Sequence, residues 1–143
     1  MIDMTALTEK FNVTCEDGKL VCADNIVEVL DFVKNNSQYS LDMLLSITAV
    51  DLNDKIELIY DLYSTLTDKN LKISVYVRDN LSQSVVSVYK SAYFDECEIY
   101  DLFGVSFEGN KNLKRLLMPE SWSGHPMLKS YKQNDERLCW NEN

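Results

Sequence analysis

The sequence is poor in the residues that build most enzyme sites. Among its 143 residues there is one histidine, His125, so a site that needs two imidazole side chains is excluded. It has no G-x-G-x-x-G, P-loop or G-x-S-x-G motif, so the usual local signals of nucleotide sites and serine hydrolases are missing. Its four cysteines fit no zinc or iron–sulfur spacing; they are Cys15, Cys22, Cys97 and Cys139. We therefore expect free thiols and no cofactor, metal or catalytic nucleophile in this chain.

Long apolar runs and turn-forming residues are also scarce. The chain has four glycines and two prolines, and no run approaches the roughly 18 apolar residues of a membrane span. Its first ten residues, MIDMTALTEK, lack the basic and apolar segments of a secretory signal. We expect a protein at the cytoplasmic side of the cytoplasmic membrane, peripheral and attached through a larger complex.

Charge is acidic overall and unevenly distributed. The net charge of −9 argues against a nucleic-acid partner, which requires a basic surface to neutralise phosphates. Residues 1–110 carry 8 basic and 19 acidic side chains, whereas residues 111–143 carry 6 basic and 4 acidic ones. This pattern indicates either ordinary solubility or a C-terminal segment that lies on a different surface from the rest of the chain.

The hydrophobic periodicity predicts an α+β fold with a small mixed or antiparallel sheet of about three to five strands covered by helices. The helical spacing of i, i+3, i+4 and i+7 and the alternating pattern of strands distinguish the elements. Helices are expected at Thr5–Phe11, Ile26–Lys34 and from Asp95 to about Phe103. Strands are expected at Lys19–Ala23, from about Ser46 to Leu52, at Ile56–Tyr63, Leu71–Val77 and Val105–Phe107.

The C-terminal quarter of the chain has little regular periodicity. Pro119, Gly124 and Pro126 interrupt it, and apolar or aromatic residues are isolated along it. Such a long irregular segment is uncommon in a compact domain and needs something to pack against. We therefore divide the chain into an α+β body, residues 1–108, and an extended docking arm, residues 109–143, within a single domain.

A cluster of carboxylates surrounds the last predicted helix, at Asp95, Glu96, Glu98, Asp101 and Glu108. Carboxylates three residues apart on a helix can bind a divalent metal or act as an acid–base pair. The favoured interpretation is structural: Asp95 caps the helix, Glu98 reaches back to its first turn, and the other acids pair with the basic arm. An independent soluble, metal-dependent enzyme that uses the Asp95–Asp101 acids is the alternative.

The segment from Tyr93 to Tyr131 resembles the signature of the complex I 30 kDa subunit family, also called the C subunits of NADH dehydrogenase. The resemblance rests on EIYDLFG, on LKRLLMP and on GHPMLKSY, in the family's order, and extends over roughly residues 40–131. Cys97 and Leu128 stand where the family has arginines, so the contacts of those arginines are not expected here. The ending DERLCWN is similar to the short version of the subunit in energy-converting [NiFe] hydrogenases, which favours that branch over an NADH or F420H2 dehydrogenase.

The resemblance implies a cofactor-free accessory subunit of a hetero-oligomeric membrane complex. Iron–sulfur clusters, and a NiFe site or flavin, are expected in partner subunits. The implied partners are a large subunit related to the NiFe hydrogenase large subunit and an iron–sulfur small subunit. A free-standing binding module of the same fold is a further alternative. For His125 and Pro126, a turn within the subunit's own fold competes with a docking role. The residues expected at the partner interface are Tyr100, Asp101, Phe103, Gly104, Arg115, Trp122, His125, Pro126, Lys129 and Trp140.

Overall fold

The structure is a computed structural model and describes residues 2–133. A five-stranded mixed sheet forms its centre, with strand order β1-β2-β5-β4-β3. The pairings are antiparallel except between β2 and β5, which run parallel. The strands of this sheet are β1 (Thr14–Glu16), β2 (Lys19–Cys22), β3 (Met43–Asp51), β4 (Ile56–Ser64) and β5 (Lys69–Val77). The predicted α+β class is confirmed.

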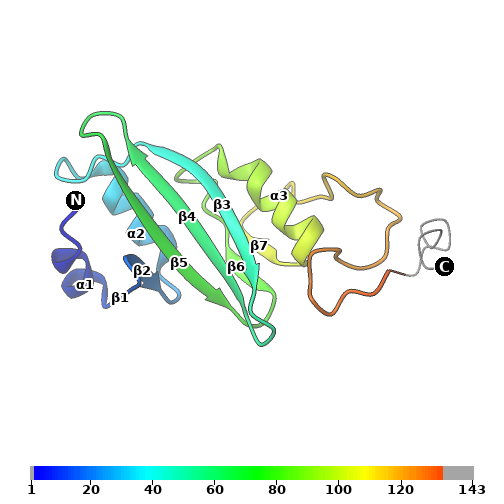
Figure 1. Cartoon of the computed structure of the whole chain (residues 1–143). Coiled ribbons are helices and arrows are strands. Elements are labelled where there is room, and N and C mark those ends of the chain that lie inside the picture. The colour runs from blue at the N-terminus through cyan, green and yellow to red at the C-terminus, as the bar shows by residue number, and fades with distance from the viewer. Residues whose placement is uncertain (1, 134–143) are drawn as a thin grey trace.

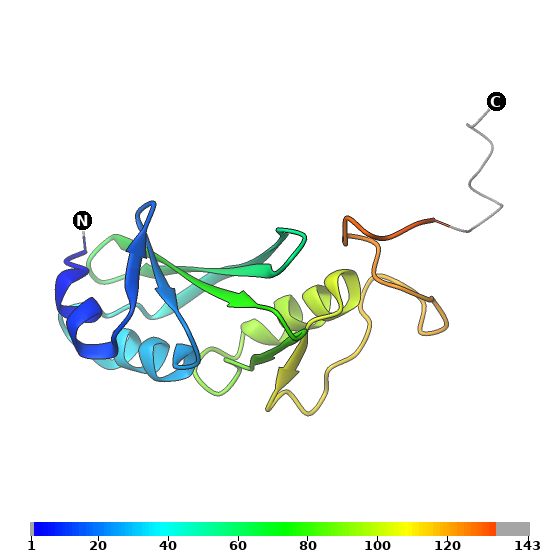
Figure 2. The same ribbon diagram turned by 90° about the horizontal axis from the view of Figure 1, so that it is seen from below.

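Helices cover one face of this sheet, as Figures 1 and 2 show. They are α1 (Thr5–Phe11), α2 (Ile26–Asn35) and α3 (Ala92–Phe103). The strands β6 (Leu81–Gln83) and β7 (Ser106–Glu108) pair in parallel as a second, two-stranded sheet. The rest of the described chain, from Gly109 to Gln133, contains neither helix nor strand and leads away from the sheet past the end of α3 (Figure 1).

The core lies between the central sheet and α2. Strand β4 alternates so that Leu58, Tyr60 and Leu62 face the helices, and all three are fully buried. From α2, the buried side chains are Ile26, Val29, Leu30 and Val33. Their helical spacing gathers them into one stripe, and burial of each aliphatic side chain contributes roughly 1.5–3 kcal/mol to the free energy of unfolding.

Several elements differ from the sequence predictions in where they start or were not predicted. Strand β3 starts at Met43 rather than near Ser46, and a register shift between Leu44 and Ser46 explains why strict alternation is absent there. Strands β1 and β6, of three residues each, were not predicted, whereas the equally short β7 was predicted one residue early, at Val105–Phe107. Helix α3 starts at Ala92, three residues before the predicted start.

Among the helices of the described part of the chain, none is long and apolar enough to cross a membrane. Cys15, Cys22 and Cys97 are free thiols. The fourth cysteine, Cys139, lies outside the described residues, as does the predicted interface residue Trp140.

Candidate functional site: the junction between helix α3 and the C-terminal arm

The last turn of α3 ends at a glycine that the backbone requires. Gly104 has a φ of 74°, in the left-handed region, and its N–H donates to the carbonyl oxygen of Tyr100 over 3.0 Å. This is the usual geometry of a helix C-terminus, and glycine adopts it without the steric cost of a side chain. The helix therefore stops at a defined residue, a few positions before the start of the arm.

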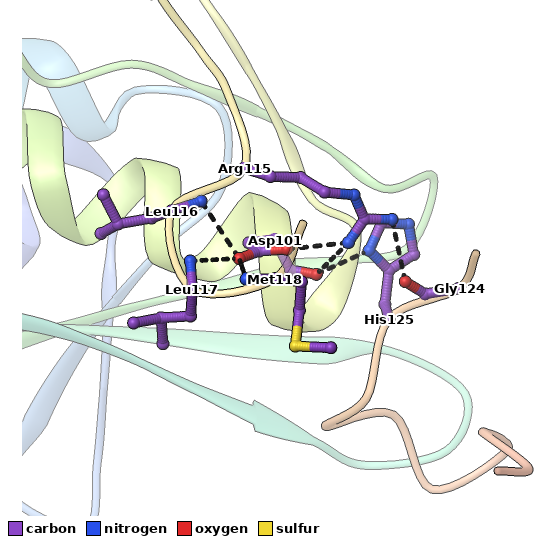
Figure 3. A network of polar contacts seen from close by, with 7 residues as sticks. All are labelled: Asp101, Arg115, Leu116, Leu117, Met118, Gly124 and His125. Atoms are coloured by element: carbon purple, nitrogen blue, oxygen red, sulfur yellow. Dashed lines mark hydrogen bonds and ion pairs between the residues drawn. The ribbon is translucent and has the colours of Figure 1, made fainter. Parts of the chain in front are cut away.

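Asp101, in that last turn, is the centre of a polar network that Figure 3 shows. Its carboxylate is fully buried and accepts a hydrogen bond from Arg115 at 2.8 Å. The other carboxylate oxygen, Oδ2, accepts from three consecutive backbone N–H groups, those of Leu116 at 3.1 Å, Leu117 at 2.6 Å and Met118 at 2.8 Å. Burial alone would raise the pKa of Asp101, but the hydrogen bonds from Met118, Arg115 and Leu117 outweigh it and lower that pKa. The carboxylate is therefore ionised and fixes the backbone of the arm.

Arg115 links its own segment of the arm to the end of α3 and to the loop at Gly124. Its Nη1 donates to the carboxylate of Asp101, and it also lies 3.3 Å from the carbonyl oxygen of Asp101. Its Nη2 donates to the carbonyl oxygen of Gly124 at 2.9 Å. A lysine cannot replace these contacts, since a single ammonium group cannot reproduce the planar fork of the guanidinium. The guanidinium that was predicted to contact a partner thus has a role within the chain.

His125 and Gly104 are packed directly against each other. The Nδ1 of His125 donates to the carbonyl oxygen of Asp101 at 2.9 Å, which requires the proton on that nitrogen. A Cβ atom placed on Gly104 would lie 2.7 Å from Cδ2 of the imidazole, a distance that real contacts do not reach. Gly104 is therefore needed for its φ and also for the close approach of the ring. Of the two roles considered for His125 and Pro126, the turn within the subunit's own fold is present in the structure.

Glu96 forms a second attachment at the beginning of the arm. It is fully buried and accepts hydrogen bonds from Ser84 Oγ, the backbone N–H of Val85 and Asn110 Nδ2, each at 2.8 Å. Burial raises the pKa of Glu96, although these hydrogen bonds oppose the rise. No signal in the sequence indicated this role, because the partners come from a loop and from the arm.

The capping prediction for the acid cluster is wrong. Helix α3 begins after Ser91, and Asp95 accepts a hydrogen bond at 2.9 Å from the backbone N–H of Ile47, on the outer strand β3. Because the helix starts at Ala92, Glu98 is its seventh residue and not its third, and its side chain is exposed. The acids of this helix point to different partners, and no group of three potential metal ligands occurs within residues 2–133.

The remaining predicted interface residues take several environments. Phe103 is buried in the core, and Tyr100 and Pro126 are half-buried, with the Tyr100 ring 6.3 Å from that of His125. Lys129 is exposed, and its backbone N–H donates to Asp51 at 2.8 Å. Trp122 is half-buried, and its indole Nε1 is enclosed without a hydrogen-bond partner in the part of the chain that the structure describes. Contact of these residues with a partner stays a prediction.

Comparison with known sequences identifies the family of the chain that carries this junction. Residues 20–137 match the family described as respiratory-chain NADH dehydrogenase, 30 Kd subunit. The chain belongs to this family. Curated relatives include the C subunits of the NADH-quinone oxidoreductases of Trichlorobacter lovleyi, 38% identical over 76% of this chain and 69% of the relative, and of Geobacter sulfurreducens, 38% identical over 78% and 71%. The chain spans 58% of the length of another matched relative, the C subunit of the Roseobacter denitrificans enzyme, with 33% identity over 78% of this chain.

Solved structures share the fold of this family member. A chain of the membrane-bound sulfane sulfur reductase, an archaeal respiratory membrane complex, superposes with a TM-score of 0.63 and 26% identity, covering 75% of this chain and 68% of that chain. The trypsin-resistant fragment of Nqo5 superposes with a TM-score of 0.60 and 23% identity, covering 76% of this chain and 95% of that chain, and supports the fold alone. The C subunits are thus named for an oxidoreductase of NADH and quinone, and the archaeal complex is named for the reduction of sulfane sulfur.

Proposed function

We propose that this family member is a cofactor-free accessory subunit of a complex-I-related, membrane-bound oxidoreductase. In this proposal its arm docks on a large subunit related to the NiFe hydrogenase large subunit, near an iron–sulfur small subunit. The protein lies at the cytoplasmic side of the membrane and is held there by its partners. One observation carries the proposal: a segment without helix or strand, from Gly109 to Gln133, is fixed to the body by the buried Asp101 carboxylate.

The arrangement supports docking because the backbone of the arm is held by hydrogen bonds while some of its apolar side chains stay exposed to solvent. Asp101 fixes the backbone at Leu116 and Leu117, yet their side chains are exposed. An isolated domain gains nothing from a long irregular segment whose apolar side chains face water. A partner that covers these side chains would gain their burial and would meet a segment that is already ordered.

Two observations favour different branches of the family. The residue pattern DERLCWN at positions 135–141 and the structural likeness to the sulfane sulfur reductase chain favour a hydrogenase-related complex. The identity of 38% to curated NADH-quinone oxidoreductase subunits favours a dehydrogenase. Affinity purification from native membranes separates them, because a large subunit with two Cys-x-x-Cys motifs indicates the hydrogenase type and flavin- and NADH-binding subunits indicate the dehydrogenase type.

Deletion of residues 111–143 tests the docking role. We expect the truncated protein to keep the far-ultraviolet circular dichroism of the body and to lose co-purification with the large subunit. Full assembly of the truncated protein would refute the proposal.

The two alternatives have their own signatures. Stoichiometric metal in the purified chain, together with an activity lost in Glu98→Gln, would indicate an independent enzyme instead. A monomer that is never recovered with membranes would indicate a free-standing binding module.

A further inference from the structure

Exposed apolar side chains of the arm lie close to the last turn of α3. Leu116, Leu117 and Met127, which we call the arm patch, are 40%, 60% and 55% exposed. The backbone N–H of Leu117 donates to Asp101 and that of Met127 donates to the carbonyl oxygen of Leu102 at 2.9 Å. Asp101 and Leu102 are consecutive. The two segments of the arm that carry the arm patch are therefore hydrogen-bonded to the same turn of α3.

The charge around the arm patch differs from that of the body. Within residues 111–133 the exposed cations are Lys111, Lys114, Lys129 and Lys132, whereas the acidic residue there is Glu120. Residues 1–110 carry 19 acidic and 8 basic side chains. Lys114 and Lys129 are each two residues from a member of the arm patch, so exposed cations accompany the exposed apolar side chains of the arm, whereas the body is acidic.

Building on the proposed function, we infer that the arm patch binds an apolar depression of a partner subunit that is bordered by carboxylates. Burial of Leu117 and Met127 supplies the affinity, and the lysines select the orientation and accelerate association. The junction at Asp101 reduces the entropy lost on binding because the backbone is already held. The guanidinium of Arg115 binds Asp101 and the carbonyl oxygen of Gly124, so Arg115 positions the arm patch and is not itself part of the binding surface.

The structure favours a protein over an anionic lipid surface as the occupant. The arm patch lies on irregular backbone held at fixed points, whereas lipid surfaces are commonly bound by amphipathic helices with a long apolar face. The acidic body beside the patch would also be repelled by an anionic leaflet. A depression bordered by carboxylates on a folded partner would fit both the apolar side chains of the arm patch and the lysines near them.

The test uses the full-length chain, expressed in its own host, with recovery of the native membrane complex as the readout. The double variants Leu117→Ser/Met127→Ser and Lys114→Glu/Lys129→Glu remove the apolar surface and reverse the charge of the lysines near it. Matched controls are Leu66→Ser, at a side chain 80% exposed in the β4–β5 hairpin, and Lys90→Glu, at an exposed lysine of the body. Thermal unfolding of each purified variant checks that the fold is retained, and Lys114→Arg/Lys129→Arg checks that charge is the property that matters.

We expect the apolar double variant to lower the amount of complex recovered by about tenfold or more. The charge-reversed variant should weaken assembly most at low salt, and the arginine variant and both controls should assemble like the wild type. If the deletion of residues 111–143 prevents assembly but the two double variants assemble normally, this inference is overturned and the proposed function stands. If the deletion itself assembles, the proposed function fails. Self-association of the isolated chain that both double variants abolish would identify a second copy as the occupant, and patch-dependent binding to vesicles of phosphatidylserine would identify lipid; either result overturns the inference.

Discussion

The body and the arm of this protein are ordered by different forces. The sheet and α2 are held by apolar burial spread over many side chains, among them Leu58, Leu62 and Ile73. The arm is held mainly by hydrogen bonds: most converge on the carboxylate and carbonyl oxygen of Asp101, and others reach Glu96 and Asp51. Burial spread over many side chains tolerates the loss of one of them, whereas the arm loses most of its hydrogen bonds when Asp101 is removed. A segment attached in this second way leaves apolar side chains such as Leu117 exposed.

The largest expected effect is at that centre. Asp101→Ala leaves the guanidinium of Arg115 and three backbone N–H groups without their acceptor, and breaking a buried ion pair of this kind costs about 3–5 kcal/mol. We expect trypsin to cleave the arm at Lys111, Lys114 and Arg115 much faster than in the wild type. Asp61→Asn, which removes a half-exposed pair with Lys72 at 3.8 Å, is the control and should cost less than about 1 kcal/mol. Equal protease resistance of the wild type and Asp101→Ala would contradict the role assigned to Asp101.

A core substitution in the body should behave differently. Leu62→Ala removes a fully buried side chain and should lower the free energy of unfolding by about 2–5 kcal/mol in urea titrations. Because the arm is attached to the body, the arm and the sheet should then unfold in one transition. Loss of the arm's protease resistance well before the sheet unfolds would show that the arm does not depend on the core.

The packing of His125 on Gly104 predicts a coupled pair. Gly104→Ala adds a methyl group against the imidazole at a backbone φ of 74°, so a loss of about 1–3 kcal/mol is expected. His125→Ala removes the clash but leaves the backbone strain, so the double variant should recover part of the loss. A double-mutant cycle by thermal unfolding measures this coupling, and strictly additive effects would show that the ring does not contact Gly104 in solution.

The smallest expected effect is a change of the free energy of unfolding with pH. The pKa of Asp101 is lowered in the folded protein, so its contribution to stability is present above the unfolded value near pH 3.9 and disappears as pH falls through the folded value. The protection factors of the Leu117 and Met118 amides, which correct their exchange rates for the intrinsic pH dependence of exchange, should therefore fall in acid. The pKa of Glu96 is raised, so its contribution has the opposite sign and decreases as pH rises through the folded value. Glu96→Gln should remove that part of the pH dependence without changing the loss of protection of the Leu117 and Met118 amides in acid.

Most elements of the body could be predicted from local patterns. The spacing of Ile26, Val29, Leu30 and Val33 predicted α2, and the alternation of side chains predicted the strands β4 and β5, because side chains repeat every 3.6 or 2 residues along these elements. The start of α3 was predicted three residues late, since Asp95 has the residue type of a cap but is used by the edge of β3. A residue type alone does not reveal which of two possible partners it will meet.

Taken by itself, the sequence determined the α+β class, the family and the absence of a periodic pattern after residue 109. The tertiary structure decided how that last segment is held. Asp101, Arg115 and His125 were recognised as family residues, but Arg115 and His125 lie 14 and 24 residues from Asp101, and no periodicity relates them. Their meeting depends on the end of α3 and on the left-handed turn at Gly104, which bring the arm back to the buried carboxylate. Contacts of this kind arise because a buried charge requires partners, and only the folded chain determines which groups supply them.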